Sequence, residues 1–169
     1  MQFREYTAND FAYIQDWIKD EKTHAMWCAN LIPYPITLDG FTQVLEKDKN
    51  DWGGRAFICE NDENQPIGFF VYSVNQKDNS AFLKYVVMDY NLRGQGYGTQ
   101  MVKQVLHQLF ELEKVTLVKL NVFDCNVGAK KCYEKAGLIQ KQYTPDAFMF
   151  QSEAWGRCFM VVENNKKKV

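Results

Sequence analysis

The segment of this sequence best suited to chemistry is VVMDYNLRGQGYGT, residues 86–99, in which three glycines alternate with other residues. Gly94, Gly96 and Gly98 lack the Cβ atoms that would keep a ligand away from the backbone. A helical pattern begins at Thr99, and the first turn of a helix has amide donors without internal partners at the positive end of its dipole. Together these features predict a site for a phosphate or pyrophosphate.

Two common nucleotide-binding motifs do not match this segment. Its glycines follow the pattern GxGxG, whereas a dinucleotide fold needs GxGxxG, and no GK[ST] follows as in the phosphate loop of a nucleoside triphosphatase. Two interpretations remain open at this point: an anion site, or a tight turn whose glycines let a helix pack closely. Arg93 would add positive charge in the first case and stabilise the turn in the second.

The segment RGQGYG, residues 93–98, resembles the [RQ]-x-x-G-x-[GA] signature of the GNAT acetyltransferases. A second match follows downstream, in LNVFDCN at 120–126, Ala129 and YEKAGL at 133–138. It resembles the family pattern L-x-V-x-x-x-N-x-x-A-x-x-x-Y-x-K-x-G-F, with Leu138 where phenylalanine is commoner. The resemblance is specific over residues 82–138; before them it covers only the order of elements. It implies an enzyme that moves an acetyl group from acetyl-CoA, its co-substrate, onto an amine, without a metal.

By this resemblance the glycine turn wraps the pyrophosphate of coenzyme A with backbone amides. The Val86 amide would face the acetyl carbonyl and stabilise the oxyanion of the transition state. Met88 would offer main-chain groups to the pantetheine arm, while the side chains of both residues belong to the core. The predicted cofactor-binding residues are Val86, Met88, Arg93, Gly94, Gln95, Gly96, Tyr97, Gly98, Thr99, Asn126 and Tyr133.

Two further residues have both a functional and a structural interpretation. Asn126 either contacts the coenzyme A arm, as its family position implies, or caps the helix that follows it. Tyr133 occupies the family position of the tyrosine that protonates the departing thiolate, and a phenol with a pKa near ~10 is a suitable donor. Its structural alternative is packing on the sheet. We predict Tyr133 and the Val86 backbone amide as catalytic groups.

The general base is not identified. Several family members carry a glutamate four residues before the position of Val86, where this chain has Phe82. Other candidates are Glu153, Asp89, Asp124, Glu21 and His24, although water can also take the proton. An acyl-cysteine at Cys125 or Cys132 is conceivable, but no histidine is placed by a motif to activate either thiol. Direct transfer in a ternary complex is therefore expected.

The resemblance places the acceptor beside the first two helices, their loop and the final strands. Aromatic and acidic residues there predict a small cationic acceptor, since rings and carboxylates attract a protonated amine. The predicted acceptor-binding residues are Trp27, Tyr34, Glu153 and Trp155, whereas Trp17 is assigned to the core. A protein N-terminus or lysine is the alternative acceptor. A non-catalytic acyl-CoA-binding regulatory module is the alternative of another class, favoured by Phe82 and disfavoured by Tyr133.

The elements that would position these groups form a mixed sheet, in an α/β (α+β) arrangement of about seven strands and four helices. The expected order is β-α-α-β-β-β-α-β-α-β-β, the GNAT acyl-CoA N-acyltransferase fold, in one domain over residues 1–169. Residues 81–88 are apolar on both faces, as expected of a central strand. Helical spacing of apolar residues from Thr99 to Leu109 predicts the helix that follows the glycine turn.

The amino-acid composition indicates the broad class of protein. Hydrophobic residues make up 46% and charged residues 24%, an ordinary globular balance. The net charge of −1 gives no sign of a nucleic acid or membrane partner. Residues 1–66 hold 12 acidic and 6 basic residues, and residues 67–169 hold 9 and 14, which suits a cationic acceptor and an anionic cofactor. Lys166, Lys167 and Lys168 are expected to be solvated.

Five separated cysteines show neither a disulfide framework nor a zinc spacing. No signal peptide and no run of ~20 apolar residues is present, so a cytoplasmic protein is expected, as a monomer or a homodimer.

Overall fold

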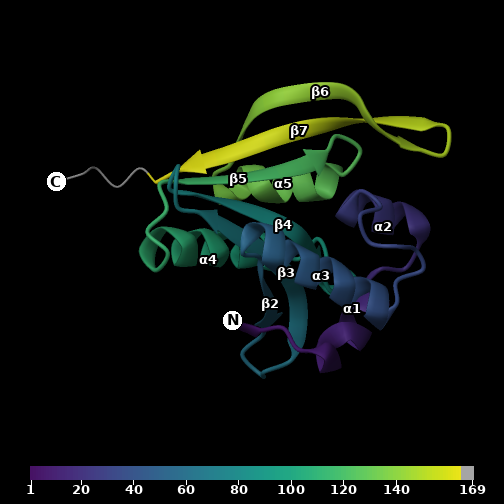
Figure 1. The fold of residues 1–169 in the computed structure, drawn as a ribbon, viewed down its shortest axis with the longest axis horizontal. Coiled ribbons are helices and arrows are strands. Elements are labelled where there is room, and N and C mark those ends of the chain that lie inside the picture. The colour runs from purple at the N-terminus through teal and green to yellow at the C-terminus, as the bar shows by residue number, and fades with distance from the viewer. Residues whose placement is uncertain (165–169) are drawn as a thin grey trace.

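The computed structural model describes residues 1–164, which form a single seven-stranded sheet with helices packed on it (Figure 1). The strands are β1 (Gln2–Glu5), β2 (Arg55–Glu60), β3 (Pro66–Asn75), β4 (Ser80–Met88), β5 (Leu117–Phe123), β6 (Ile139–Phe150) and β7 (Glu153–Glu163). The helices are α1 (Phe11–Trp17), α2 (Glu21–Cys28), α3 (Leu38–Trp52), α4 (Tyr97–Glu111) and α5 (Val127–Ala136), with short 3-10 turns η1 (Ala8–Asp10) and η2 (Tyr90–Leu92). The lysines predicted to be solvated, 166–168, lie outside the described residues.

The sheet has the order β1-β2-β3-β4-β5-β7-β6, so β4 is the central strand, as its apolar sequence predicted. All neighbouring strands are antiparallel except β4 and β5. That parallel pair extends over only three residue pairs, from Ser80 opposite Leu117 to Phe82 opposite Lys119. Beyond Phe82 the two strands separate, and β5 continues with β7 while β4 continues with β3. The sheet is therefore split at its centre.

Two apolar layers cover the sheet. Helix α4 packs Met101, Val102, Val105, Leu106 and Leu109, which follow helical spacing, against one face. Helices α1 and α3 cover the other face of the first half of the sheet, where Ile14, Trp17 and Phe41 are buried. Trp17 is thus in the core, as predicted. Burying these side chains contributes roughly 1.5–3 kcal/mol each relative to exposure.

The mixed α/β fold with seven strands is confirmed, but the helix count differs from the prediction. Residues 1–164 hold five α-helices, not four, because α2 was not recognised. Its buried residues include the polar His24, so the usual apolar stripe is weak. A local signal was present: the Asp20 carboxylate accepts a hydrogen bond from the Thr23 amide and caps the helix.

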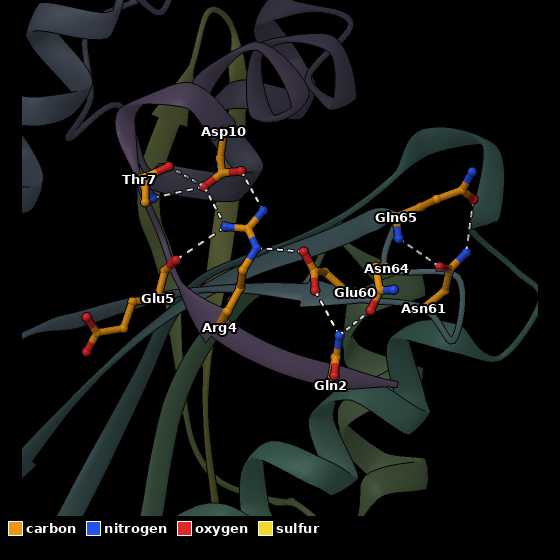
Figure 2. A network of polar contacts seen from close by, with 9 residues as sticks. All are labelled: Gln2, Arg4, Glu5, Thr7, Asp10, Glu60, Asn61, Asn64 and Gln65. Atoms are coloured by element: carbon orange, nitrogen blue, oxygen red, sulfur yellow. Dashed lines mark hydrogen bonds and ion pairs between the residues drawn. The ribbon is translucent and has the colours of Figure 1, made fainter.

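A polar network joins β1, η1 and β2 around Arg4 (Figure 2). The Arg4 guanidinium donates to both Asp10 oxygens at 2.7 and 2.8 Å and to Glu60 Oε1 at 2.6 Å. The Thr7 amide and hydroxyl also donate to Asp10. Gln2 joins Glu60 to Asn64. Burial would raise the pKa of Asp10, but the hydrogen bonds from Arg4 and Thr7 hold it below its ordinary value. The network fixes the first strand on the sheet.

We predict that Arg4→Met lowers the free energy of unfolding by about 2–3 kcal/mol at neutral pH. The loss is below the ~3–5 kcal/mol of a fully buried pair, because the Arg4 side chain is 38% exposed, although Asp10 and Glu60 are only 5% and 11% exposed. Since the folded pKa of Asp10 is lowered, its contribution is present above the unfolded pKa and is lost as pH falls through the folded pKa. Denaturant titrations of both proteins against pH measure this difference.

The control is Lys47→Met, which removes an exposed pair with Asp51 and should change the unfolding free energy by less than about 0.5 kcal/mol. If the difference in unfolding free energy between Arg4→Met and the wild type did not change with pH, the loss of stability could not be attributed to the interaction with Asp10.

Candidate active site

A cleft of about 370 Å³ opens where β4 and β5 separate. This volume lies within the range of small-molecule sites. Its walls come from β4, β5, α2, the glycine turn with the start of α4, and α5. The lining residues are Thr23, Met26, Trp27, Leu83, Lys84, Tyr85, Val86, Val87, Met88, Arg93, Gly94, Gly96, Gly98, Thr99, Asn121, Val122, Asn126, Gly128, Ala129, Lys131, Cys132, Tyr133 and Lys135.

The glycine turn has features of both interpretations, an anion site and a tight turn that lets a helix pack closely. Gly94 and Gly96 have φ of +79° and +91°, which side chains rarely adopt, and a Cβ at either position would meet no atom within 4 Å. The backbone is therefore open to a ligand at these two residues. Gly98 instead lies in helix packing, since its Cβ would touch Cys132 and Met88 at 3.5 Å. Gly96 is the N-cap of α4, so the first amides of this helix have no helical acceptors, and Gly96, Gly98 and Thr99 line the cleft.

Arg93 turns its guanidinium toward main-chain carbonyls. Its Nη2 donates to the Trp17 carbonyl at 2.9 Å and to the Met88 carbonyl at 3.2 Å. These contacts join the end of α1 to the end of β4 and support the turn-stabilising interpretation. Burial lowers the pKa of Arg93, partly offset by Tyr90, Asp89 and Asp20. Its charge still contributes to the field of the cleft.

Two residues of the turn that were predicted to bind the cofactor, Gln95 and Tyr97, are not among the lining residues. Gln95 donates to the Asn91 carbonyl, and Tyr97 packs against the core.

Strand β4 has a bulge beside the cleft. The register passes from Lys84 opposite Val71 to Val87 opposite Phe69, so Tyr85 and Val86 face a single residue of β3. Tyr85 has φ of +51°, a costly conformation for an aromatic residue. Such bulges change the direction of neighbouring groups and are frequent next to active sites. The bulge thus sets the orientation of the Val86 main chain.

Tyr133 lies in α5 and lines the cleft. Its side chain is buried, and its hydroxyl forms no hydrogen bond within residues 1–164. Burial raises the pKa of Tyr133 well above its ordinary value, so the hydroxyl stays protonated at neutral pH. Asn126 caps α5 by accepting from the Ala129 amide at 3.3 Å, and it also lines the cleft. Its structural role is present, and its contact with a cofactor stays a prediction.

The charged side chains that line the cleft are all positive in the part of the chain that the structure describes: Lys84, Arg93, Lys131 and Lys135. Lys84 is paired with Asp48 of α3, which does not line the cleft. Lys131 and Lys135 are one turn apart on α5 and have exposed side chains. The cleft therefore favours an anion. Arg93 was predicted to bind the cofactor and Lys135 lies within the downstream motif, whereas Lys84 and Lys131 were not singled out by the sequence.

The candidates for a general base all lie elsewhere. His24 is buried, which lowers its pKa, and Cys28 Sγ lies 3.3 Å from its Nε2. Glu153 is paired with Lys22, and Asp124 accepts from the Gly156 amide and the Tyr143 hydroxyl. The remaining candidates, Asp89 and Glu21, are not cleft residues either. No carboxylate or histidine among residues 1–164 lines the cleft.

Both thiols near the cleft are weak nucleophiles. Burial raises the pKa of Cys132, which lines the cleft, although Thr99 and Lys135 partly lower it. Burial also raises the pKa of Cys125. Because the thiolate is the reactive form, neither residue is activated for acyl transfer.

Of the four residues predicted to bind an acceptor, the structure places Trp27 in the cleft. Trp155 is buried among Phe123, Phe148 and Phe150 at the tip of the β6–β7 hairpin, which packs against α2. Glu153 Oε2 accepts from Lys22 Nζ at 2.7 Å and from Trp155 Nε1 at 3.1 Å. These two residues therefore hold α2 in place.

Tyr34 lies in the loop after α2, where its ring is 5.1 Å from that of His24. It is half-exposed and does not line the cleft.

Sequence reasoning missed several other lining residues. Thr23 and Met26 lie on the unrecognised helix α2, and Tyr85 is placed by a bulge that has no sequence signature. Lys131 and Lys135 could have been found, since their spacing puts them on one face of a predicted helix.

Two features of other protein classes are absent from residues 1–164. These residues hold no group of three or more His, Cys, Asp and Glu side chains arranged to bind a metal ion. None of their helices is both long and apolar enough to span a membrane.

Comparison with protein families gives a match over residues 11–138 to the model described as "Acetyltransferase (GNAT) family". Two curated relatives come from Bacillus subtilis: a "Probable spermine N(1)-acetyltransferase" of the natto strain BEST195 and a "Spermine/spermidine N(1)-acetyltransferase" of strain 168. Each is 27% identical over an alignment of 81 residues, and the match covers 44% of this chain. The match spans only about half of each relative, 53% of its length.

Solved structures agree in fold over nearly the whole chain. The spermidine N-acetyltransferase of Vibrio cholerae in complex with CoA and spermine has a TM-score of 0.80 at 17% identity, covering 96% of this chain and 94% of that one. The spermidine/spermine N-acetyltransferase of Vibrio cholerae in complex with manganese ions has a TM-score of 0.74 at 18% identity, covering 96% and 91%. At these identities the likeness concerns the fold.

We predict that Trp155→Ala lowers the free energy of unfolding by about 3–5 kcal/mol, because it leaves a cavity between the hairpin and α2. Hydrogen exchange should become faster in α2, around Ala25, which packs in the same cluster. Chemical denaturation and exchange measured by mass spectrometry check both effects. Met149→Ala, at an exposed position of β6, is the control and should change neither. Unchanged exchange in α2 would show that Trp155 does not hold this helix.

Proposed function

The chain belongs to the GNAT acetyltransferase family, and we propose that it transfers an acetyl group from acetyl-CoA to a primary amine of a small cationic compound. The observation that supports this most is the coincidence of three features in one cleft. They are the split between β4 and β5, the open glycine turn at the start of α4, and the unpaired hydroxyl of Tyr133 among the residues that the structure describes. A nucleotide site of another kind would not need the split strands or the phenol.

The cleft fits the chemistry of coenzyme A. The positions at Gly94 and Gly96 leave room for phosphate oxygens, and the first amides of α4 offer donors to them. Lys131, Lys135 and Arg93 supply positive charge for the phosphates. The separated edge of β4 has main-chain groups that no longer pair with β5, and these suit an extended amide-containing arm.

Acetyl-CoA supplies the acetyl group in activated form, as a thioester. The Val86 amide, oriented by the bulge, is the proposed donor to the developing oxyanion. Tyr133, protonated and facing the same cleft, is the proposed donor to the leaving sulfur. Met88 would hold the arm through its main chain, and Asn126 through its side chain.

Transfer is proposed to be direct, within a ternary complex of both substrates. The raised thiol pKa values of Cys125 and Cys132 support this, because they disfavour an acyl-cysteine. The amine would lose its proton to water, since no base of residues 1–164 lines the cleft.

The acceptor class is supported by two kinds of observation. The curated relatives are described as acetyltransferases of spermine and spermidine, which are cationic amines. In this chain, Trp27 presents an aromatic ring on the α2 side of the cleft. Cation–π contact with such a ring suits a protonated amine.

We predict that Gly96→Asp weakens coenzyme A binding by at least about 100-fold, because a carboxylate would enter the space for the phosphates. The matched control is Gly96→Asn, which has the same shape without the charge and carries the same strain from the positive φ of this position. It should weaken binding by less than about tenfold. Calorimetric titration with coenzyme A measures both affinities, and equal affinities of the two variants would exclude the turn as the phosphate site.

We also predict that Tyr133→Phe lowers kcat by about 10²-fold while the affinity for coenzyme A changes little. Because burial keeps Tyr133 protonated, the loss should be similar at neutral and moderately alkaline pH. Thiol release from acetyl-CoA with a polyamine as acceptor measures the rate. Wild-type turnover in Tyr133→Phe, under conditions where chemistry limits the rate, would reduce Tyr133 to a packing residue.

A further inference from the structure

Two aromatic side chains face each other on the side of the cleft formed by α2 and β4. The rings of Trp27 and Tyr85 have centroids 6.0 Å apart at an interplanar angle of 63°, and both residues line the cleft. The indole N–H of Trp27 is buried without a hydrogen-bond partner among residues 1–164.

Tyr85 is placed there by the bulge of β4. It directly precedes Val86, and its positive φ accompanies the shift of register. Its side chain packs with the α1–α3 layer, whereas Val86 packs with the α4–α5 layer. The ring of Tyr85 and the hydroxyl of Tyr133 therefore belong to opposite sides of the same strand. Tyr85 thus lines the cleft directly beside Val86, the residue proposed to bind the acetyl carbonyl.

The Tyr85 hydroxyl is free to bind a ligand. It forms no hydrogen bond with any residue that the structure describes. Burial, together with Asp48 and Cys28, raises the pKa of Tyr85 to about 12, so it remains a neutral phenol near neutral pH. A neutral phenol oxygen can accept a hydrogen bond from an N–H group.

Charged groups do not provide an alternative anchor on this side. No carboxylate among residues 1–164 lines the cleft, and the neighbouring Lys84 is bonded to Asp48 and Ser73. The second oxygen of Asp48 is buried without a hydrogen-bond partner among residues 1–164, and Asp48 does not line the cleft. A protonated amine at this place would therefore meet aromatic faces and one hydroxyl.

We propose that Tyr85 and Trp27 determine acceptor specificity by holding an ammonium group of the acceptor through cation–π contact and a hydrogen bond to the Tyr85 hydroxyl. The proposal rests on the function proposed above and narrows the substrate class to amines that carry a second cationic nitrogen in addition to the reacting one. The rings replace the carboxylates usually expected for such ligands. Attraction of this kind contributes about tenfold or more in affinity where the cation is desolvated.

The test compares a linear diamine with the monoamine of the same chain length. Calorimetry measures the affinity of each for the protein saturated with coenzyme A, and thiol release measures kcat and KM. The wild type should prefer the diamine by about tenfold. Tyr85→Asn, in which asparagine tolerates the positive φ, should abolish the preference by weakening diamine binding. Tyr85→Phe, which keeps the ring, should lose about threefold in diamine affinity. The affinity for coenzyme A should stay within about twofold in both variants.

Tyr13→Phe, at an exposed position of α1, is the control and should leave every value unchanged. A wild type without preference for the diamine, or a Tyr85→Asn variant that keeps it, would overturn the proposal. Failure of acetyl transfer is a separate result. Binding of the diamine to the coenzyme A complex tests the subsite without turnover. Absence of thiol release with any amine would count only against the proposed enzyme function.

Discussion

The parallel pairing of β4 with β5 ends after Phe82 and Lys119, and the rest of the molecule is organised around this break. Buried backbone donors and acceptors are costly without partners, so a central strand that leaves its neighbour needs other groups to bond. In β4 the break is followed by a bulge at Tyr85 and then by the glycine turn. The strand edge, the bulge and the helix start thus form one continuous surface for a ligand.

Distant segments keep this break open in a fixed shape. Arg93 ties the end of β4 to the end of α1 through two carbonyls. The β6–β7 hairpin packs Trp155 and its aromatic neighbours against α2, which carries Trp27. The predicted acceptor residues Glu153 and Trp155 affect the cleft through this packing. The two sides of the cleft also differ: the glycine turn and the lysines proposed to bind phosphate lie on α4 and α5, and the uncharged ring of Trp27 lies on α2.

The sequence was informative where short-range rules operate. The strands around β4, the helix after the glycine turn and the cap at Asn126 follow from periodicity and capping preferences, and the resemblance supplied the family. The sequence was uninformative where long-range packing determines the structure. Helix α2 lacks a clean apolar stripe, and the bulge at Tyr85 arises from the pairing of β3 with β4. Lys131 and Lys135 reach the cleft only because α5 lies beside the break.

The central claim is that a coenzyme A arm occupies the break between β4 and β5 with its phosphates on the glycine turn. Hydrogen exchange of the backbone amides, with and without coenzyme A, tests it most directly. The account predicts slower exchange in two segments, residues 83–88 of β4 and residues 94–99 of the turn and α4, with little change in the exposed edge strand β6. Coenzyme A binding that leaves both segments unchanged and protects another part of the sheet would contradict it.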